Sequence, residues 1–504
     1  MRSLLCATVF SALACASAAL ADYSTSPASP LSLVATAADD VQPKIAAGPA
    51  DSHYISYFTG SGYDVALQRL DKDGKAMWKS PTLVKDRTLS STTDYGMASD
   101  SLGNAYVAYD TAAAQIEVSA ISPTGSILWT VVMTTGGFVA SAQVTVASDG
   151  FVWVAHVQDA TTRVQRFDPV SGAATFVSPL TVNETGATQN VADIEPSIGG
   201  AVILSCVRYT TFLGAKILRA HRIESNGTRP WAAIGVSVFT TGSLQFGNFP
   251  QFIPDGAGGG YFAWYATGPL QCHVQRIDAN GALIYGTNGT SVTTTTTFER
   301  VDPSMLLGAD GRLYVFWGQH TAASSIYGVY GQCFAKGVRQ WGILGAAIEP
   351  MGTTYSRTFA RAIRLGDGVG CTYDDSTSAI QDNLKCAAVS ATGAVKSTFE
   401  VATNPGSKYR FATASAVDGG SVLAWQGGVS TGASDVWAAR INADNTLGPP
   451  APAGIAGDLN GDGAVNAQDL AILLSSWGGS GIADIDGDGV VDAQDLAILL
   501  SAWT

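Results

Sequence analysis

Short runs of apolar residues recur along most of the chain, and each ends within a few residues at Gly, Pro, Asp or Asn. Runs of four to eight residues bounded by such turn formers predict β-strands. Asp-Gly pairs such as Asp310-Gly311 stand directly before several runs. They predict hairpin turns, because Gly takes a positive φ without steric cost. The clearest expected strands end in an aromatic residue: 106–109, 152–156, 261–264, 314–317 and 422–425.

These strands belong to a longer repeat. A strand ending in Gln-Arg-Ile-Asp, or a variant of it, is followed by a turn with Gly and then by Trp or Tyr, as in 67–78 and 274–285. Eight copies follow one another at a period of about 53 residues, and each holds four short strands. Four-stranded units repeated in this way are typical of β-propeller blades. The sequence therefore predicts an all-β fold, an eight-bladed β-propeller over residues 22–447, with seven blades as the alternative.

The two ends of the repeat region complement each other. The eighth copy stops at Leu447 without a fourth strand, whereas residues 29–34 resemble the fourth strand at 80–84. We expect the N-terminal strand to complete the last blade, which would leave no unpaired edge between the first and last repeats.

The connections between the expected strands suggest where ligands bind. The first-to-second and third-to-fourth connections are expected to be short, and the other two long and variable, on one face of the ring. Variable loops on a rigid scaffold commonly carry binding residues. Candidates in these loops are Asp110, His156, Asp159, Tyr209, Tyr265, His320, Asp374, Asp375 and Gln426. Candidates where first strands begin, nearer the propeller axis, are Asp94, Asp193, Glu195, Arg300, Asp302, Arg361 and Arg410. Such a mixture of charges would suit a sugar or a uronate; the alternative is solvated rim charge.

Charge changes the picture at the C-terminus. The chain of 504 residues is 46% hydrophobic and only 14% charged, with a net charge of −13. That balance argues against nucleic acid as a partner, which requires a basic surface. Eight Asp lie between residues 458 and 495, and no Lys or Arg follows residue 442. Acid concentrated in this way indicates a cation site.

The first 21 residues predict export. Arg2 precedes an apolar run, and Ala19-Leu20-Ala21 provides small residues for cleavage before Asp22, as in a secretory signal peptide. A faint lipoprotein-like box, 12–15, is the alternative. No other segment is apolar enough to span a membrane, so we expect an extracellular or cell-surface protein.

Five cysteines remain after cleavage: Cys206, Cys272, Cys333, Cys371 and Cys386. An odd number in so long a chain does not indicate a disulfide scaffold. Cys371 and Cys386 fall on neighbouring expected strands, so they could pair, or they could remain buried thiols.

Two 12-residue acidic loops follow a Pro/Ala/Gly linker at 448–456. They begin at Asp458 and, 26 residues later, at Asp484, and each runs into an apolar helix. Position 6 is Gly, and position 7 offers a backbone carbonyl, as in EF-hand-like calcium loops. The expected ligands of two Ca²⁺ ions are Asp458, Asn460, Asp462, Ala464, Asn466, Asp469, Asp484, Asp486, Asp488, Val490, Asp492 and Asp495.

Residues 457–504 resemble a type I dockerin, with Asp469 and Asp495 at position 12 of the duplicated loops. The resemblance implies a calcium-dependent fold that docks onto a cohesin module of a scaffold or surface protein. The family reads its partner largely at loop positions 10 and 11, often with Ser/Thr, where this chain has Ala467-Gln468 and Ala493-Gln494. The alternative is a calcium-stabilised clip or another surface-attachment signal.

No catalytic motif stands out. His-Glu-x-x-His, Gly-x-Ser-x-Gly and the P-loop do not occur, and no paired carboxylate motif of a glycosidase is recognisable. Two functions from different classes remain. One is a secreted propeller that binds carbohydrate or another macromolecule, held in place by the dockerin-like module, in polysaccharide utilisation. The other is a propeller-fold glycoside hydrolase or polysaccharide lyase carrying the same module. The sequence names no catalytic residue for either.

Overall fold

The computed structural model describes residues 22–429, 433–451, 456–460, 464–486 and 488–503. The expected signal peptide, residues 1–21, and the expected calcium ligand Asp462 lie outside these ranges. The chain divides into two compact units, Met1–Pro449 and Pro450–Thr504.

The first unit consists of eight antiparallel sheets, one for each repeat of the sequence. Blades 1 to 4 contain β2 (Val41–Ala47), β3 (His53–Thr59), β4 (Asp64–Leu70) and β5 (Thr82–Lys85); β6 (Gly96–Ser99), β7 (Ala105–Asp110), β8 (Gln115–Ile121) and β9 (Ile127–Thr135); β10 (Val139–Val146), β11 (Val152–Gln158), β12 (Thr161–Phe167) and β13 (Leu180–Val182); β14 (Thr188–Pro196), β15 (Val202–Tyr209), β16 (Ile217–Ile223) and β17 (Val236–Phe239). Blades 5 to 8 contain β18 (Phe252–Pro254), β19 (Gly260–Ala266), β20 (Gln271–Ile277) and β21 (Thr290–Ser291); β22 (Glu299–Leu307), β23 (Leu313–His320), β24 (Tyr327–Ala335), β25 (Val338–Arg339) and β26 (Ala346–Gly352); β27 (Ser356–Leu365), β28 (Gly368–Ser378), β29 (Gln381–Val389) and β30 (Val395–Ala402); β31 (Ser407–Ser415), β32 (Ser421–Gly428), β33 (Asp435–Ile441) and β1 (Leu31–Val34). Single 3₁₀ turns lie at Pro49–Asp51 and Ile198–Gly200.

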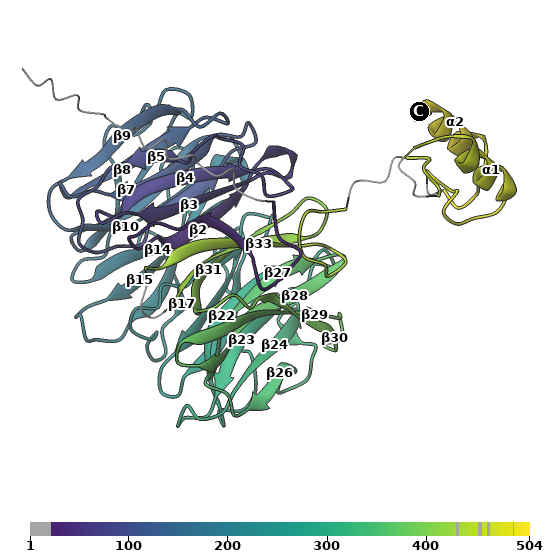
Figure 1. Cartoon of the computed structure of the whole chain (residues 1–504). Helices are drawn as coiled ribbons and strands as arrows, with labels where there is room; N and C mark the ends of the chain where they lie inside the picture. The colour runs from purple at the N-terminus through teal and green to yellow at the C-terminus, as the bar shows by residue number, and fades with distance from the viewer. Residues whose placement is uncertain (1–21, 430–432, 452–455, 461–463, 487, 504) are drawn as a thin grey trace, which may run out of the picture. The chain divides into compact units, whose positions relative to one another are not determined.

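The sheets form an eight-bladed β-propeller, as the repeat predicts. The first strand of each blade is innermost and contacts the first strands of both neighbouring blades, so that the eight close a ring. In Figure 1 the last blade, with β31 and β33 in yellow-green, lies beside β2 and β3 of the first. The seven-bladed alternative is wrong.

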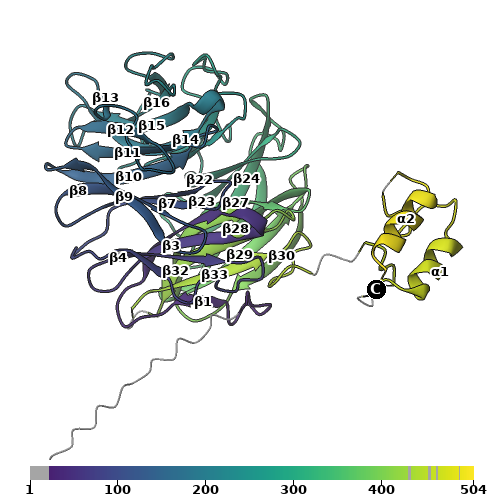
Figure 2. The ribbon, with the colours of Figure 1, turned by 90° about the horizontal axis from the view of Figure 1, so that it is seen from above.

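The N-terminal strand closes the ring. β1 pairs antiparallel with β33, and Figure 2 shows it at the outer edge of the last blade. Leu31 and Leu33 are buried in the interface between the last and first blades. Tyr23, which precedes the strand, is also buried, and its N–H donates to the Asp73 carbonyl at 2.8 Å. The N-terminus thus supplies both a strand and an aromatic side chain to the last blade.

The recurring Gly and Trp of the repeat join each blade to the next. The indole N–H of Trp78 donates to the carbonyl of Pro123 in the following blade at 2.9 Å. A Cβ on Gly125, which has φ +87°, would lie 2.9 Å from the Trp78 ring. The same pairing recurs between Trp129 and Gly172, Trp231 and Gly281, Tyr285 and Gly337, and Trp341 and Gly393. Tyr23 occupies the corresponding place on Gly74.

The third-to-fourth connections are short, as expected, in blades 2, 6 and 7, but long in blades 1, 3, 4 and 5. In blade 1, after the tight turn, residue 76 makes an isolated bridge to Leu70, and the chain continues to Thr82 before the fourth strand begins. Cys371 and Cys386 do not pair. The register places Cys371 opposite Ala387 and Cys386 opposite Thr372, so the two side chains face opposite sides of the blade. All five cysteines from Cys206 onward are buried thiols.

The second unit contains two helices, α1 (Ala467–Ser475) and α2 (Ala493–Ser501). Asn466 and Asp492 cap them, each accepting a backbone N–H two residues on. Leu473 and Leu499 are buried in a small core with Val465, Ala483 and Val491. Across the described ranges, no helix is long and apolar enough to cross a membrane.

Candidate functional site

Six of the eight innermost strands share a backbone irregularity near the end at which each begins, called here the entry end. A register shift interrupts the pairing of β2, β10, β14, β22, β27 and β31 with the strand that follows each of them. In five blades the first residue of the bulge has a positive φ of 52–59°: Gln42, Ser141, Asp302, Phe359 and Arg410. Such a conformation is costly for residues other than Gly, and bulges re-aim side chains, often beside functional sites.

These bulges place charged side chains in contact between blades. Lys44 Nζ lies 2.7 Å from Asp94 Oδ1, and Gln143 Nε2 donates to Asp94 Oδ2 at 2.7 Å. On the other side of the ring, Arg361 lies 2.8 Å from Asp302. Half of the Asp94 side chain and 39% of the Asp302 side chain are exposed, so this set reaches solvent. We call Lys44, Asp94, Gln143, Asp193, Asp302, Arg361 and Arg410 the entry ring.

The carboxyls of this ring differ in acidity. Although burial opposes it, the Lys44 ion pair and the hydrogen bond from Gln143 lower the pKa of Asp94. Burial raises the pKa of Asp193 to about 7, despite two backbone N–H groups, those of Ile194 and Phe252, that donate to it. Burial and the neighbouring Asp193 carboxyl raise the pKa of Glu195 well above its usual range. The entry ring therefore contains one carboxyl that ionises readily, Asp94, and one that is readily protonated, Asp193. Carboxyls whose pKa values are shifted apart in this way can act as a base and an acid.

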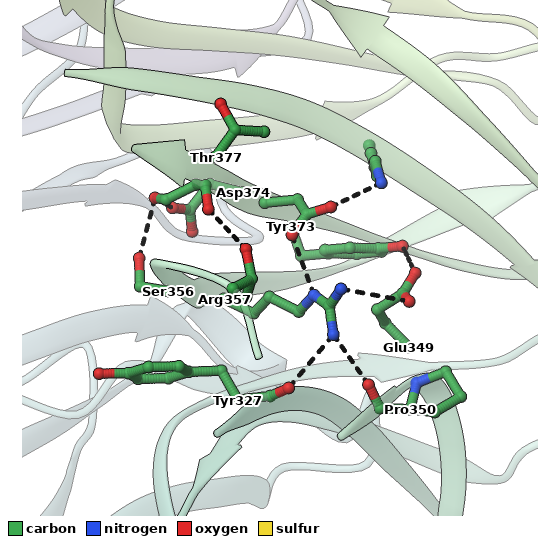
Figure 3. Close-up of polar contacts among 12 residues, drawn as sticks. Tyr327, Glu349, Pro350, Ser356, Arg357, Tyr373, Asp374 and Thr377 are labelled. Carbon is green, nitrogen blue, oxygen red and sulfur yellow. Dashed lines mark hydrogen bonds and ion pairs between the residues drawn. The ribbon is translucent and has the colours of Figure 1, made fainter. Parts of the chain in front are cut away.

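A second polar cluster lies in the interface between blades 6 and 7, at the same end. Arg357 Nε donates to Asp375 at 2.9 Å, and its NH1 donates to the carbonyls of Tyr327 and Pro350 (Figure 3). Lys385 lies 2.6 Å from the other Asp375 oxygen. The side chains of Arg357 and Asp375 are only 13% and 10% exposed. Because every charge has a partner, this cluster fastens the two blades together.

Asp374, labelled in Figure 3, is buried beside that cluster. Its Oδ1 accepts hydrogen bonds from the N–H and hydroxyl of Thr358 at 3.0 and 2.8 Å. Burial raises its pKa to about 7; the bonds from Thr358 lower it, and the Asp382 carboxyl raises it. Ser376 Oγ lies 3.2 Å from Asp374 and 2.6 Å from Asp382, so it links the two carboxyls.

Several other residues expected to face a ligand are instead part of the core. Asp110 is buried and forms an ion pair with Arg87 at 2.8 Å. His156 is fully buried, and burial lowers its pKa to about 3. Arg300 is 1% exposed and donates to the carbonyls of Thr295 and Phe298.

The remaining loop candidates make local contacts. Asp159 accepts the Phe138 N–H, His320 contacts the Thr321 carbonyl, and Gln426 links Gln42 with Tyr409. Tyr209 and Tyr265 are half-buried. Among the propeller's described residues, no hydrogen bond or ion pair joins any of these five to the entry ring, although burial and the Asp302 carboxyl raise the pKa of Tyr265.

Lys44 and Gln143 were missed by the sequence reading. Both are the first residue paired beyond the bulge, opposite Ser56 and Ala155 of the second strand, the position that Asp193 and Arg361 hold in their blades. Aligning the repeats on the aromatic residue of the second strand would have identified them.

The second acidic loop of the C-terminal unit brings three carboxylates together. One oxygen each of Asp484, Asp486 and Asp488 lies within 4.8 Å of the others. Backbone N–H groups fix this arrangement: Gly489 donates to Asp484 at 2.9 Å and Val490 to Asp488 at 2.9 Å. The Asp488 N–H lowers the pKa of Asp486, but burial and the adjacent carboxylates outweigh it and raise that pKa. Clustered carboxylate oxygens are the donor set that a hard cation such as Ca²⁺ prefers, so these residues fit the ion.

Asp469 and Asp495, at position 12, are fully buried. Asp495 accepts the N–H groups of Ile485, Asp486 and Asp492 at 2.5, 3.1 and 2.8 Å. Asp469 accepts those of Leu459, Asn460 and Asn466, and the backbone bonds lower the pKa of both carboxyls. These two side chains therefore tie each loop to its helix. Since a carboxylate has about four lone-pair positions, each has about one left.

Comparisons with known proteins give different results for the C-terminal unit and for the propeller. Residues 456–502 match the family described as the dockerin type I domain. No curated protein matches the chain. Among solved structures, an ulvan lyase of polysaccharide lyase family PL25 has 12% identity and a TM-score of 0.46, over 83% of this chain and 96% of that one.

Two further structures are similar at the same level. The Dos1 propeller has 9% identity and a TM-score of 0.49, over 80% of this chain and 92% of that one. A putative 6-phosphogluconolactonase from Bacteroides fragilis has 13% identity and a TM-score of 0.40, over 73% of this chain and 98% of that one. Similarities this low carry no argument about the function of the propeller.

The dockerin match agrees with the duplicated loops and capped helices described above. Type I dockerins bind calcium and dock onto cohesins, and they are typically found in extracellular proteins. This chain is an eight-bladed β-propeller protein that carries a type I dockerin domain at residues 456–502.

Proposed function

We propose that the propeller binds a polysaccharide at its entry end, and that the dockerin attaches it to a cohesin on a scaffold or surface protein. The observation that carries the proposal is the entry ring, where bulged strands direct partly exposed charged groups towards one end of the propeller. Side chains already held by partners in neighbouring blades lose little entropy when a hydroxyl-rich ligand binds. The dockerin connects this binding site to exported assemblies.

In this proposal the chain is exported after removal of residues 1–21, and residues 448–456 act as a linker. The dockerin holds two Ca²⁺ ions, one in each loop. Asp484, Asp486 and Asp488 supply carboxylate oxygens and Val490 a carbonyl to one ion, with Asp492 and Asp495 completing the loop. The corresponding residues of the first loop, Asp458 to Asp469, hold the other. Calcium compensates the carboxylate charge, which couples ion binding to folding.

Retention of the full chain on a panel of immobilised polysaccharides tests the binding function. We expect at least one polysaccharide to retain the protein, and the Lys44→Gln, Arg361→Gln double variant to lose most of that retention. The matched control is Lys396→Gln, which removes an exposed cation from the outer strand β30. Retention that survives the double variant would place the ligand elsewhere on the propeller, and no retention by any polysaccharide would refute the proposed function.

A glycoside hydrolase or polysaccharide lyase is the second candidate. It is favoured by the opposite directions of the pKa shifts of Asp94 and Asp193, because a lowered pKa would suit a base and a raised pKa an acid. The same panel tests it, scored for new reducing ends and for unsaturated products. A retained polysaccharide that releases neither product would exclude the enzyme and leave the binding protein.

A further inference from the structure

Arg410 is the exception in the charge pattern of the entry ring. Asp94, Asp302 and Arg410 occupy the same position, two residues before Gly96, Ser304 and Ala412, which pair with Ala108, Phe316 and Ala424 of the second strands. In blades 6 and 8 this position begins the bulge, and in blade 2 it precedes the strand. At this position the two aspartates bond to residues just beyond the bulge in adjacent blades. Asp94 pairs with Lys44 of blade 1, and Asp302 pairs with Arg361 of blade 7.

Blade 8 has a cation where those blades have an anion. β31, which carries Arg410, contacts β27 on one side and β2 on the other. The residues just beyond the bulge in these strands are Arg361 and Lys44, both cations. Three basic residues thus occupy consecutive blades, and the two outer ones have carboxylates in blades 6 and 2. Among the described residues, no carboxylate pairs with Arg410.

The backbone around Arg410 is held in place although its side chain is exposed. Arg410 has φ 59°, a conformation that costs about 1 kcal/mol or more for a residue with a Cβ. Gln426 accepts the Gln42 N–H at 3.2 Å and donates to the Tyr409 hydroxyl at 3.2 Å, which fastens the bulge to blade 1. Phe411, the other bulge residue, is buried, and the centroid of its ring lies 5.9 Å from that of Phe359 in blade 7. A strained, fastened position with an exposed guanidinium is typical of a site prepared for a ligand.

We propose that Arg410, with Lys44 and Arg361 on the blades beside it, binds an acidic group of the polysaccharide, either a carboxylate or a sulfate. This inference rests on the proposed function and specifies the class of ligand. A guanidinium forms two parallel hydrogen bonds to either acidic group. The ligand's charge takes the place that Asp94 and Asp302 occupy in the other blades.

Affinity electrophoresis of the full chain, in calcium, with two matched pairs of polymers tests this proposal. Polygalacturonate is compared with its methyl ester, and dextran sulfate with dextran. We expect the acidic member of at least one pair to bind about tenfold more tightly than its neutral partner, and Arg410→Gln to lose about tenfold. The pair that responds identifies carboxylate or sulfate. The control is Arg364→Gln, which removes an exposed Arg from the far end of the same kind of strand and should bind within about twofold of the native chain.

Folding and charge are checked by a second variant. Arg410→Glu should abolish binding of the acidic polymer but melt at or above the native temperature, because the new carboxylate lies on β31, between the strands that carry Lys44 and Arg361. The inference is overturned if neutral and acidic members bind alike, if Arg410→Gln keeps its affinity, or if Arg364→Gln loses as much. If only other, neutral polysaccharides of the wider panel are retained, the inference fails and the binding function stands. If nothing in the wider panel is retained, both fail.

Discussion

Single hydroxyl protons decide the charge of buried groups in this protein. Ser376 Oγ has one proton and lies between two carboxyls, with the shorter distance, 2.6 Å, to Asp382. Ser356 Oγ donates a hydrogen bond to Ser376 Oγ at 2.8 Å. If Ser376 donates to Asp382, the contact of 3.2 Å to Asp374 requires a proton on Asp374. Geometry and the raised pKa, about 7, therefore agree that Asp374 is protonated in the folded protein at mildly acidic pH.

This assignment predicts a pH-dependent effect of Asp374→Asn. The raised pKa means that stability is fully present below about pH 4, where the unfolded chain is also protonated, and is lost as the pH rises towards 7. Asn can donate to Ser376 and accept from Thr358, as the protonated acid does. The melting temperature of the variant should equal that of the native protein near pH 4 and exceed it by several degrees at pH 7.5.

The control for this comparison is Asp367→Asn, which changes an exposed carboxyl in the same blade. Its melting temperature should follow that of the native chain at every pH. An Asp374→Asn variant that is less stable than the native protein at pH 7.5 would show that the fold stabilises the ionised carboxylate, and that the pKa of Asp374 is not raised.

The calcium loops make a prediction at the same scale. The Asp484→Ala, Asp488→Ala double variant removes two of the three clustered carboxylates. We expect calorimetric titration with calcium to show one site instead of two, because too few oxygens remain to hold an ion in that loop. The matched variant Asp458→Ala, Asp462→Ala should remove the other site. Two sites remaining in either variant would show that these aspartates are not the ligands.

At the scale of elements, the N-terminal segment is as important as a whole repeat. It supplies β1, the two buried leucines and Tyr23, which packs on Gly74 as Trp78 packs on Gly125. Deleting residues 22–36 should expose the edge of β33 and lower the melting temperature by about 10 °C or more, with aggregation. Tyr23→Ala, which keeps the strand, should lower it by several degrees, whereas Leu102→Ala at an exposed turn should have no effect. An unchanged melt of the deletion protein would contradict closure by this segment.

The Trp and Gly of the repeat show what a local sequence pattern can predict and what it cannot. Their spacing identifies a repeating turn, and a propeller follows from the four strands per copy. The Trp of one copy donates to the next copy's turn at 2.9–3.0 Å, which is a contact between residues 40 to 50 positions apart. The aromatic residue that packs on Gly74 is Tyr23. It could not be assigned from the last repeat, because it comes from the other end of the chain.

At the scale of the whole molecule, the propeller and the dockerin are separate compact units. The dockerin contains eight Asp and no Lys or Arg, so its carboxylates repel one another without a cation. Chelating calcium should abolish the helical circular dichroism of α1 and α2 and move the melting temperature of the propeller by less than about 1 °C, because only the dockerin binds the ion.

A chain that ends at residue 449 provides the control for this experiment, and it should melt at the temperature of the full chain with or without calcium. A propeller transition that shifts by several degrees on chelation, or on removal of the dockerin, would show that the two units are coupled energetically.

The sequence by itself identified the repeat, the closing strand and the dockerin, because each depends on local periodicity: strands, turns and loop ligands at fixed spacing. It favoured eight blades, and the structure excluded the alternative of seven. The entry ring was only partly visible. Asp94, Asp302, Arg361 and Arg410 were identified as charged residues at strand entrances, but Asp110, His156 and Arg300 appeared equivalent to them and proved to be buried. Which charges meet across blades, and whether Cys371 faces Cys386, depends on register and on the bulges. Those are set by packing between segments that lie far apart in the chain, so only the tertiary structure decided them.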